Sequence, residues 1–272
     1  MGRGAAPIAV LVYGVRIGLD GDSDEGLADL RSVLPPGARQ CRGSARDISY
    51  ALRRASGNGA SDSGETAGYV DGRILDRSPD YQAVVQSIHR HVQLFVAEHA
   101  PRRVFIHAGV VAWKGQAVVI PGRTHFGKST LVAALLRAGA TYYSDEFAVV
   151  DSLGRIHPYP QLIGLRDGNG RSRGFDPAEF SARVGRKPLM ARLILVTRHR
   201  TGARWRPQRI SRGAGMLALL TNTVSARREP ARALGSLNRL LAGATVLKGS
   251  RGEAEAVVDH LVSSGHLPPW HS

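Results

Sequence analysis

The chain has 272 residues, 43% of them apolar and 22% charged, which is typical of a globular protein with one large domain or two small ones. A single cysteine, Cys41, excludes an internal disulfide and a cysteine-rich metal site. The apolar run after Pro7 is too short for a secretion signal, and no later run is long enough to span a membrane. We therefore expect a cytoplasmic protein with no membrane partner.

The formal net charge is +15, and its excess is local. Residues 1–100 carry 11 Lys or Arg against 12 Asp or Glu, whereas twelve basic residues and no acidic residue lie between Glu179 and Glu229. A basic stretch of this kind attracts anions, whether nucleotide, acidic peptide or nucleic acid. Arginine spread over a solvated surface is an equally compatible interpretation.

The first hundred residues predict a small α+β lobe. Short apolar and turn-forming runs indicate a strand over 8–17, a short helix over 26–33, a strand or helix over 45–54, a loop over 56–68 and a strand over 72–75. From Asp80, apolar residues recur at steps of three and four, which predicts an amphipathic helix to about Ala100. We place the domain boundary there, with residues 1–100 in the lobe and 101–272 in a second domain.

The second domain contains the motif G-x-x-x-x-G-K-[ST] between Gly122 and Ser129. An apolar strand over 116–120 precedes it and a helix over 129–139 follows, which is the context a phosphate-binding loop requires. Glycines let consecutive N–H groups converge on phosphate oxygens, and the helix adds its positive end. The expected nucleotide-binding residues are Gly122, Arg123, Thr124, His125, Phe126, Gly127, Lys128, Ser129 and Thr130.

An acidic pair follows the helix. Residues 140–150 predict a strand, then Asp145 and Glu146, then another strand. A carboxylate at the end of a neighbouring strand is suited to Mg²⁺ that bridges nucleotide phosphates, so we expect Asp145 and the Ser129 hydroxyl to be metal ligands. Glu146 is the candidate base for an attacking hydroxyl. A solvated acidic turn is the alternative interpretation.

These residues resemble a known family. The segment 106–111, the glycine motif, 143–146 and the His157-Pro158-Tyr159-Pro160 run look like the core of the HPr kinase/phosphorylase group of serine kinases, and their order is also similar to ATP-dependent phosphoenolpyruvate carboxykinase. The resemblance implies an α/β domain of α+β character, with a P-loop on a mixed sheet. It also implies ATP and Mg²⁺ as cofactors, and His107 near the transferred phosphate.

The chain departs from that family in three places. Bulky residues occupy 123–126, Glu146 stands where an aspartate is usual, and no glycine-rich signature segment follows the acidic pair, so phosphorylase activity is not expected. Further on, residues 166–174 predict an anion-facing loop. A buried strand over 193–196 leads to a basic run at 197–200 that would supply a cation to the phosphoryl group. Helices are expected over 213–221, 230–242 and 252–263.

The leading hypothesis is an ATP-dependent kinase that transfers the γ-phosphate to a hydroxyl, by resemblance a serine of a protein or peptide, with small-molecule acceptors also open. Its expected catalytic residues are His107, Lys128, Asp145 and Glu146. The alternatives are an NTPase switch, and a nucleotide-binding scaffold whose basic face, with the Arg204-Trp205-Arg206 run, binds nucleic acid. The residues leave the oligomeric state open, although hexamers occur among the HPr kinases.

Overall fold

A computed structural model describes residues 6–54, 64–122, 127–166 and 172–269. The chain divides into two compact units, Met1–Arg102 and Arg103–Ser272. Secondary structure is mixed, with sheets of both pairing senses and helices on their faces. In the described ranges, no helix is both long enough and apolar enough to cross a membrane.

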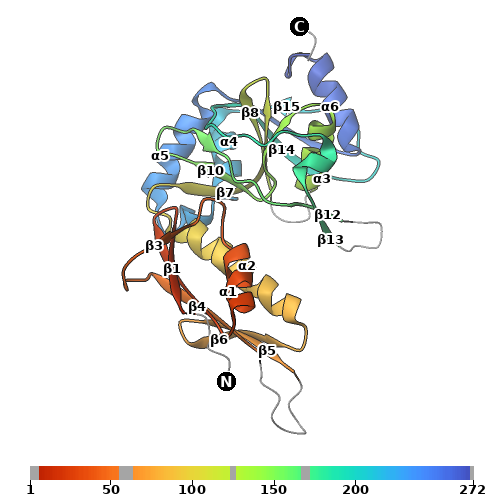
Figure 1. The fold of residues 1–272 in the computed structure, drawn as a ribbon. Coiled ribbons are helices and arrows are strands. Elements are labelled where there is room, and N and C mark those ends of the chain that lie inside the picture. The colour runs from red at the N-terminus through yellow and green to blue at the C-terminus, as the bar shows by residue number, and fades with distance from the viewer. Residues whose placement is uncertain (1–5, 55–63, 123–126, 167–171, 270–272) are drawn as a thin grey trace. The chain divides into compact units, whose positions relative to one another are not determined.

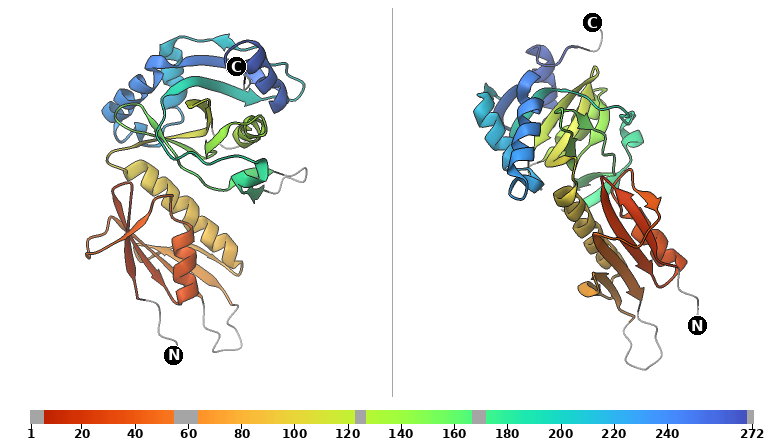
Figure 2. Two further views of the ribbon diagram at one scale, coloured as in Figure 1. Left: turned by 45° about the horizontal axis from the view of Figure 1, so that its top comes forward. Right: turned by 90° about the vertical axis from the view of Figure 1, so that its left-hand side faces the viewer.

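The first unit is a six-stranded sheet covered on one face by two helices (Figures 1 and 2). Its strand order is β3-β1-β2-β4-β5-β6, and only the β2–β4 pair is parallel. The elements are β1 Ile8–Val12, β2 Val15–Gly21, α1 Asp24–Ser32, β3 Arg39–Cys41, β4 Ile48–Arg54, β5 Thr66–Val70, β6 Arg73–Ser78 and α2 Tyr81–His99. Helix α1 packs on β2 and β4, and α2 packs on β5 and β6.

The long helix α2 confirms the prediction from apolar spacing. The Asp80 side chain caps it by accepting hydrogen bonds from the N–H groups of Gln82 and Ala83, and the helix ends at Ala100, directly before Pro101. Its apolar stripe, which includes Val84 and Ile88, lies against the sheet at Gly68.

Two predictions in this unit were wrong. The expected strand over 8–17 is a hairpin, because Tyr13 (φ 50°) and Gly14 (φ 88°) both adopt the left-handed conformation of a two-residue turn. The loop predicted over 56–68 was too long, since Thr66 to Gly68 pair with β4. Residues 55–63 lie outside the described part. The segment 45–54, left open between strand and helix, forms a strand from Ile48.

The second unit is built on a mixed sheet, as expected. Its strand order is β11-β10-β7-β8-β14-β16-β15, with β9 also paired to β7. Strands β8, β14 and β16 run parallel to one another, and the other pairs are antiparallel. The strands are β7 Val104–Trp113, β8 Gln116–Pro121, β9 Thr141–Ser144, β10 Phe147–Val150, β11 Ile156–His157, β14 Ala191–His199, β15 Gln208–Arg209 and β16 Thr245–Arg251.

Helices cover both faces of this sheet (Figures 1 and 2). On one face lie α3 Lys128–Arg137 and α6 Ala254–Ser263, and on the other α4 Arg212–Leu220 and α5 Pro230–Leu240. Side chains of β14 alternate between the faces: Leu193 and Leu195 pack in the α3 core, whereas Ile194 packs in the α4 core. The carboxyl ends of the three parallel strands therefore meet at one edge, between two helical layers.

The predictions for this unit need three corrections. Strand β16 was not predicted, because its second half is polar and contains Gly249. The loop expected over 166–174 was wrong in part, since β12 Ile163–Arg166 pairs with β13 Ser172–Phe175, while residues 167–171 lie outside the described part. Trp205 is only 8% exposed and belongs to the α3 core, so its ring is not presented for stacking on a nucleic-acid base.

Candidate active site

The glycine loop, residues Gly122 to Thr130, leaves β8 and enters α3. The Gly122 N–H donates to the carbonyl oxygen of His107 at 3.0 Å, which joins the start of the loop to β7. Gly127 has φ 76° and ψ 24°, a left-handed conformation, and α3 begins at the next residue. Arg123, Thr124, His125 and Phe126 lie outside the described residues, so their contacts with a nucleotide stay a prediction.

Lys128, the first residue of α3, is only 8% exposed. Burial lowers the pKa of its ammonium group below the ordinary lysine value, while the charges of Glu146 and Asp145 act in the opposite direction. The next two residues differ in exposure: Ser129 is partly buried and Thr130 is exposed. The buried cation lies at the positive end of the helix dipole, and the two positive charges together suit an anionic ligand.

Arg251 is a residue of this site that sequence reasoning missed. It ends β16 and is 1% exposed, and its guanidinium donates to the carbonyl oxygens of Gly127 at 2.6 Å and Gly252 at 2.9 Å. A Cβ atom on Gly127 would lie 2.5 Å from the Arg251 Nη2 atom. The arginine therefore fixes the end of the glycine loop, and no local motif around residue 251 signals this contact.

The acidic pair lies in a tight turn between β9 and β10. The buried Ser144 hydroxyl accepts hydrogen bonds from the N–H groups of Glu146 at 3.1 Å and Phe147 at 3.0 Å. A serine hydroxyl that takes two backbone donors fixes the turn and so the direction of both carboxylates. The expected strand, acidic pair and second strand are thus confirmed, and Asp145 is buried at 7% exposure, whereas the Glu146 side chain is partly exposed.

The Asp145 carboxylate faces the glycine loop. Its Oδ2 atom accepts from the Ser129 hydroxyl at 3.1 Å and the Gly164 N–H at 3.0 Å, and the Tyr142 hydroxyl lies 3.2 Å from Oδ1. Burial raises the pKa of Asp145, although the hydrogen bonds from Gly164, Ser129 and Tyr142 oppose the shift. The structure therefore brings together the two residues that the sequence predicted as metal ligands.

This pair fits a magnesium ion. Bonds of about 2.1 Å in an octahedron place neighbouring ligand oxygens about 3.0 Å apart, close to the 3.1 Å between the Ser129 and Asp145 oxygens. A bound cation would also offset the cost of an ionised carboxylate at a buried position. No group of three His, Cys, Asp or Glu side chains suited to a metal occurs among the described residues, so a cation here would take its other ligands from phosphate and water.

His107 and Glu146 form a second pair beside the loop. They are brought together because His107 pairs with Phe147 in the β7–β10 register, and the His107 Nδ1 atom lies 3.5 Å from the Glu146 Oε1 atom. The His107 ring packs on the Phe147 ring at a centroid distance of 4.7 Å. Both side chains keep some exposure, 27% for His107 and 44% for Glu146, so a solute can reach them.

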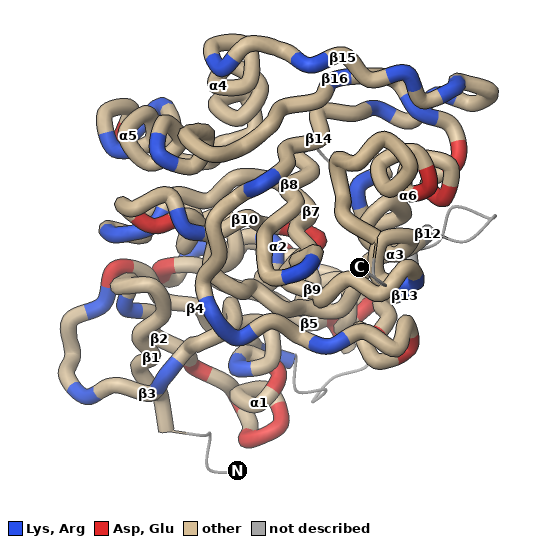
Figure 3. The backbone as a smooth tube through the Cα atoms, turned by 90° about the horizontal axis from the view of Figure 1, so that it is seen from above, with Lys and Arg blue, Asp and Glu red and all other residues tan. Residues whose placement is uncertain are grey.

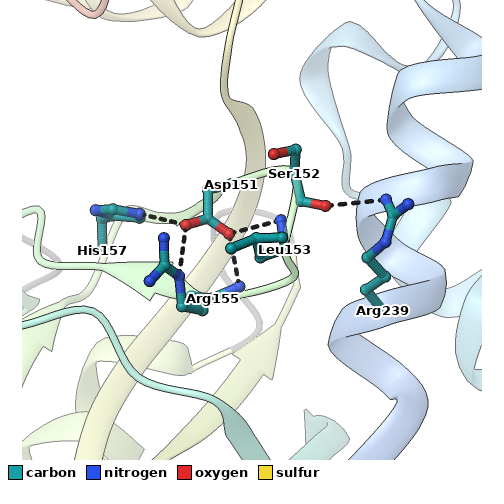
Figure 4. A network of polar contacts seen from close by, with 6 residues as sticks. All are labelled: Asp151, Ser152, Leu153, Arg155, His157 and Arg239. Atoms are coloured by element: carbon teal, nitrogen blue, oxygen red, sulfur yellow. Dashed lines mark hydrogen bonds and ion pairs between the residues drawn. The ribbon is translucent and has the colours of Figure 1, made fainter.

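His157, part of the run that resembles the kinase family, has a structural partner (Figure 4). Its Nε2 atom lies 2.9 Å from the Asp151 carboxylate, which also accepts from the Leu153 N–H and from the backbone and side chain of Arg155. Burial opposes ionisation of Asp151, but the hydrogen bonds from His157 and Arg155 prevail and lower its pKa to about 2. This network stabilises the turn between β10 and β11.

Comparisons with known proteins add little to this geometry. No protein-family model matches the chain, and no curated protein matches it. Among solved structures, the chain is similar to the HPr(Ser) kinase/phosphatase from Coxiella burnetii at 17% identity and a TM-score of 0.30, over 60% of this chain and 95% of that one. Because this match is so weak, we derive the function from the residues of the site.

Proposed function

We propose that the second unit is an ATP-dependent kinase that transfers the γ-phosphate to a hydroxyl group. The observation that carries the proposal is the approach of the acidic turn to the glycine loop, seen in the 3.1 Å contact between Ser129 and Asp145. Phosphoryl transfer depends mainly on positioning and on neutralising charge, and the site supplies both through fixed backbone groups and a buried lysine.

The glycine loop would hold the nucleotide phosphates. Backbone N–H groups at the start of α3 point toward the loop, and Lys128 adds a full positive charge where the outer phosphates would lie. Arg251 and the Leu131 N–H both donate to the Gly127 carbonyl oxygen and so fix the end of the loop. The loop is thus held in shape by a residue that need not contact the nucleotide.

Ser129 and Asp145 would hold the magnesium ion, which when bound neutralises negative charge on the phosphates. The Ser129 hydroxyl and the Asp145 carboxylate offer the hard oxygen ligands this ion prefers. The Gly164 N–H and the Tyr142 hydroxyl hold the carboxylate in place when the nucleotide leaves.

Glu146 would act as the general base. Its carboxylate is more exposed than that of Asp145 and lies next to His107, so it can accept a proton from an incoming hydroxyl. His107 would orient the carboxylate. The acceptor is by this account a hydroxyl of a protein, a peptide or a small molecule, with a serine favoured by the family resemblance.

The test is transfer of label from γ-labelled ATP with magnesium, in extract of the source cell, by the wild type and by Lys128→Ala and Asp145→Asn. We expect label on a peptide, protein or metabolite, and its loss in both variants. Label found only as free phosphate would instead identify an NTPase switch. ATP binding without turnover, together with salt-sensitive retention on nucleic acid, would identify the scaffold.

A further inference from the structure

A second site lies beside the glycine loop, on the opposite face of the sheet from α3. It is a pocket of about 360 Å³ at the carboxyl ends of the parallel strands, lined by Pro121 of β8, Gly122 of the glycine loop, the ends of β14 and β16, and residues at the end of α4. This volume lies within the range of small-molecule sites. The edge where parallel strands end is also a common place for ligands in α/β sheets.

The lining is cationic and polar. Side chains alternate along a strand, so Arg198 of β14 and both Lys248 and Ser250 of β16 lie on the same face as Ile194 and Val246, which pack in the α4 core. No acidic side chain lines the pocket among the residues that the structure describes. Figure 3 shows a basic position at the start of α4 and another on β15, both outside the pocket lining.

A polar atom of one residue in the pocket wall has no hydrogen-bond partner among the described residues. The Asn222 side-chain amide donates to the carbonyl oxygen of Ala218 at 2.8 Å, but its buried Oδ1 atom accepts no hydrogen bond from any described residue. Buried polar atoms are normally paired, so Asn222 is an unusual residue of this wall, although its Oδ1 atom is buried and is not open to the pocket.

The pocket adjoins the residues of the proposed transfer step. The Asn222 carbonyl oxygen accepts from the His107 N–H at 2.8 Å, and the His107 carbonyl oxygen accepts from the Gly122 N–H at 3.0 Å. His107 therefore contacts the pocket wall and the start of the glycine loop through its backbone, and Glu146 through its side chain. The pocket wall and the His107–Glu146 pair thus adjoin through the backbone of a single residue of β7.

We propose that this pocket binds an oxyanion carried by the phosphoryl acceptor, either a carboxylate or a phosphate group, through Lys248, Arg198 and Ser250. The inference rests on the kinase proposal for the role of the ligand, but the pocket itself is tested separately. Lysine and arginine give an oxyanion charge-assisted hydrogen bonds, and the Ser250 hydroxyl can add a neutral one. The acceptor is then an anionic molecule or segment that bears a hydroxyl.

Nuclear magnetic resonance of the full chain, saturated with the magnesium complex of AMP-PNP, tests the site. With the glycine loop filled, inorganic phosphate and glycolate are titrated in turn, and we expect shifts at the amides of Lys248, Gly249 and Ser250. Lys248→Gln should weaken binding about tenfold or more, the effect of losing a hydrogen bond to a charged group. Lys187→Gln, the matched control, removes an exposed lysine outside the pocket and should leave binding unchanged.

The ion that binds with the higher affinity shows whether the acceptor carries a phosphate or a carboxylate. In the labelled extract, that ion should inhibit transfer by the wild type, and added ATP should not relieve the inhibition. Relief by ATP, equal ion affinity in Lys248→Gln, or the same loss in Lys187→Gln would overturn the assignment. Failure of AMP-PNP to bind would refute the kinase proposal alone, since the same titration of nucleotide-free Lys128→Ala still shows whether the pocket takes an anion.

Discussion

Replacing Gly127 by alanine tests the contact between Arg251 and the glycine loop. An alanine at φ 76° costs about 1–2 kcal/mol for the left-handed conformation alone. Its Cβ would lie 2.5 Å from the Arg251 Nη2 atom, and the buried guanidinium must move and lose its 2.6 Å hydrogen bond to the Gly127 carbonyl oxygen. A hydrogen bond from a charged group contributes about 1.5–3 kcal/mol, so Gly127→Ala should destabilise the unit by about 2.5–5 kcal/mol.

Gly202→Ala is the matched control. Gly202 has φ 73° but nothing lies within 4 Å of the position of its Cβ, so this variant should show only the backbone cost, about 1–2 kcal/mol. Urea denaturation followed by tryptophan fluorescence measures both, because Trp113, Trp205 and Trp270 all belong to the second unit. If Gly127→Ala costs no more than Gly202→Ala, Arg251 does not hold the loop as described.

Three further predictions concern the acidic turn and its surroundings. Asp151→Asn should lower the free energy of unfolding by about 2 kcal/mol above pH 4, because the pKa of Asp151 falls from 3.8 to about 2 on folding. The wild type should lose this advantage as pH falls toward 2. If the network contributes nothing, the urea midpoints of the two proteins will follow parallel curves against pH. The pH dependence of stability should have the opposite sign at Asp145, because folding raises its pKa. As pH rises above 3.8, the nucleotide-free wild type should lose stability relative to Asp145→Asn, and magnesium with ATP should reverse the loss. Equal pH profiles of the two proteins would contradict this. Ser144→Ala leaves two backbone donors without their acceptor and should cost about 1–3 kcal/mol by the same denaturation assay, whereas an unchanged midpoint would show that the turn forms without it.

The parts of the site that the sequence predicted are local. The strand before Gly122 and the helix after Gly127 form from adjacent residues, and so do the two strands around Asp145 and Glu146. Turn chemistry, helix propensity and apolar spacing act over a few residues, which is why one sequence is enough to read them.

The parts that the sequence did not predict depend on pairing over long distances. Arg251 contacts Gly127 across 124 residues, through the alignment of β16 beside β14. The Gly164 N–H reaches Asp145 because the chain returns after β11. A polar strand end such as the second half of β16 shows no apolar alternation, so neither its structure nor its role could be inferred from residues near it.

The hairpin at Tyr13 shows a different limit. Val10, Val12, Val15 and Ile17 are apolar on both sides of the turn, and the run therefore looks continuous. Tyrosine rarely has a positive φ, so only Gly14 marks the turn in the sequence. The antiparallel register between β1 and β2 then stabilises a conformation that residue preferences alone would not favour.

Calorimetric titration of the full chain with ATP, with and without magnesium, tests most directly whether the glycine loop and the acidic turn form one nucleotide site. Binding that requires magnesium, and that weakens at least about tenfold in both Lys128→Ala and Asp145→Asn, is the predicted result. Binding that is unchanged in either variant, or that is independent of magnesium, would contradict the account.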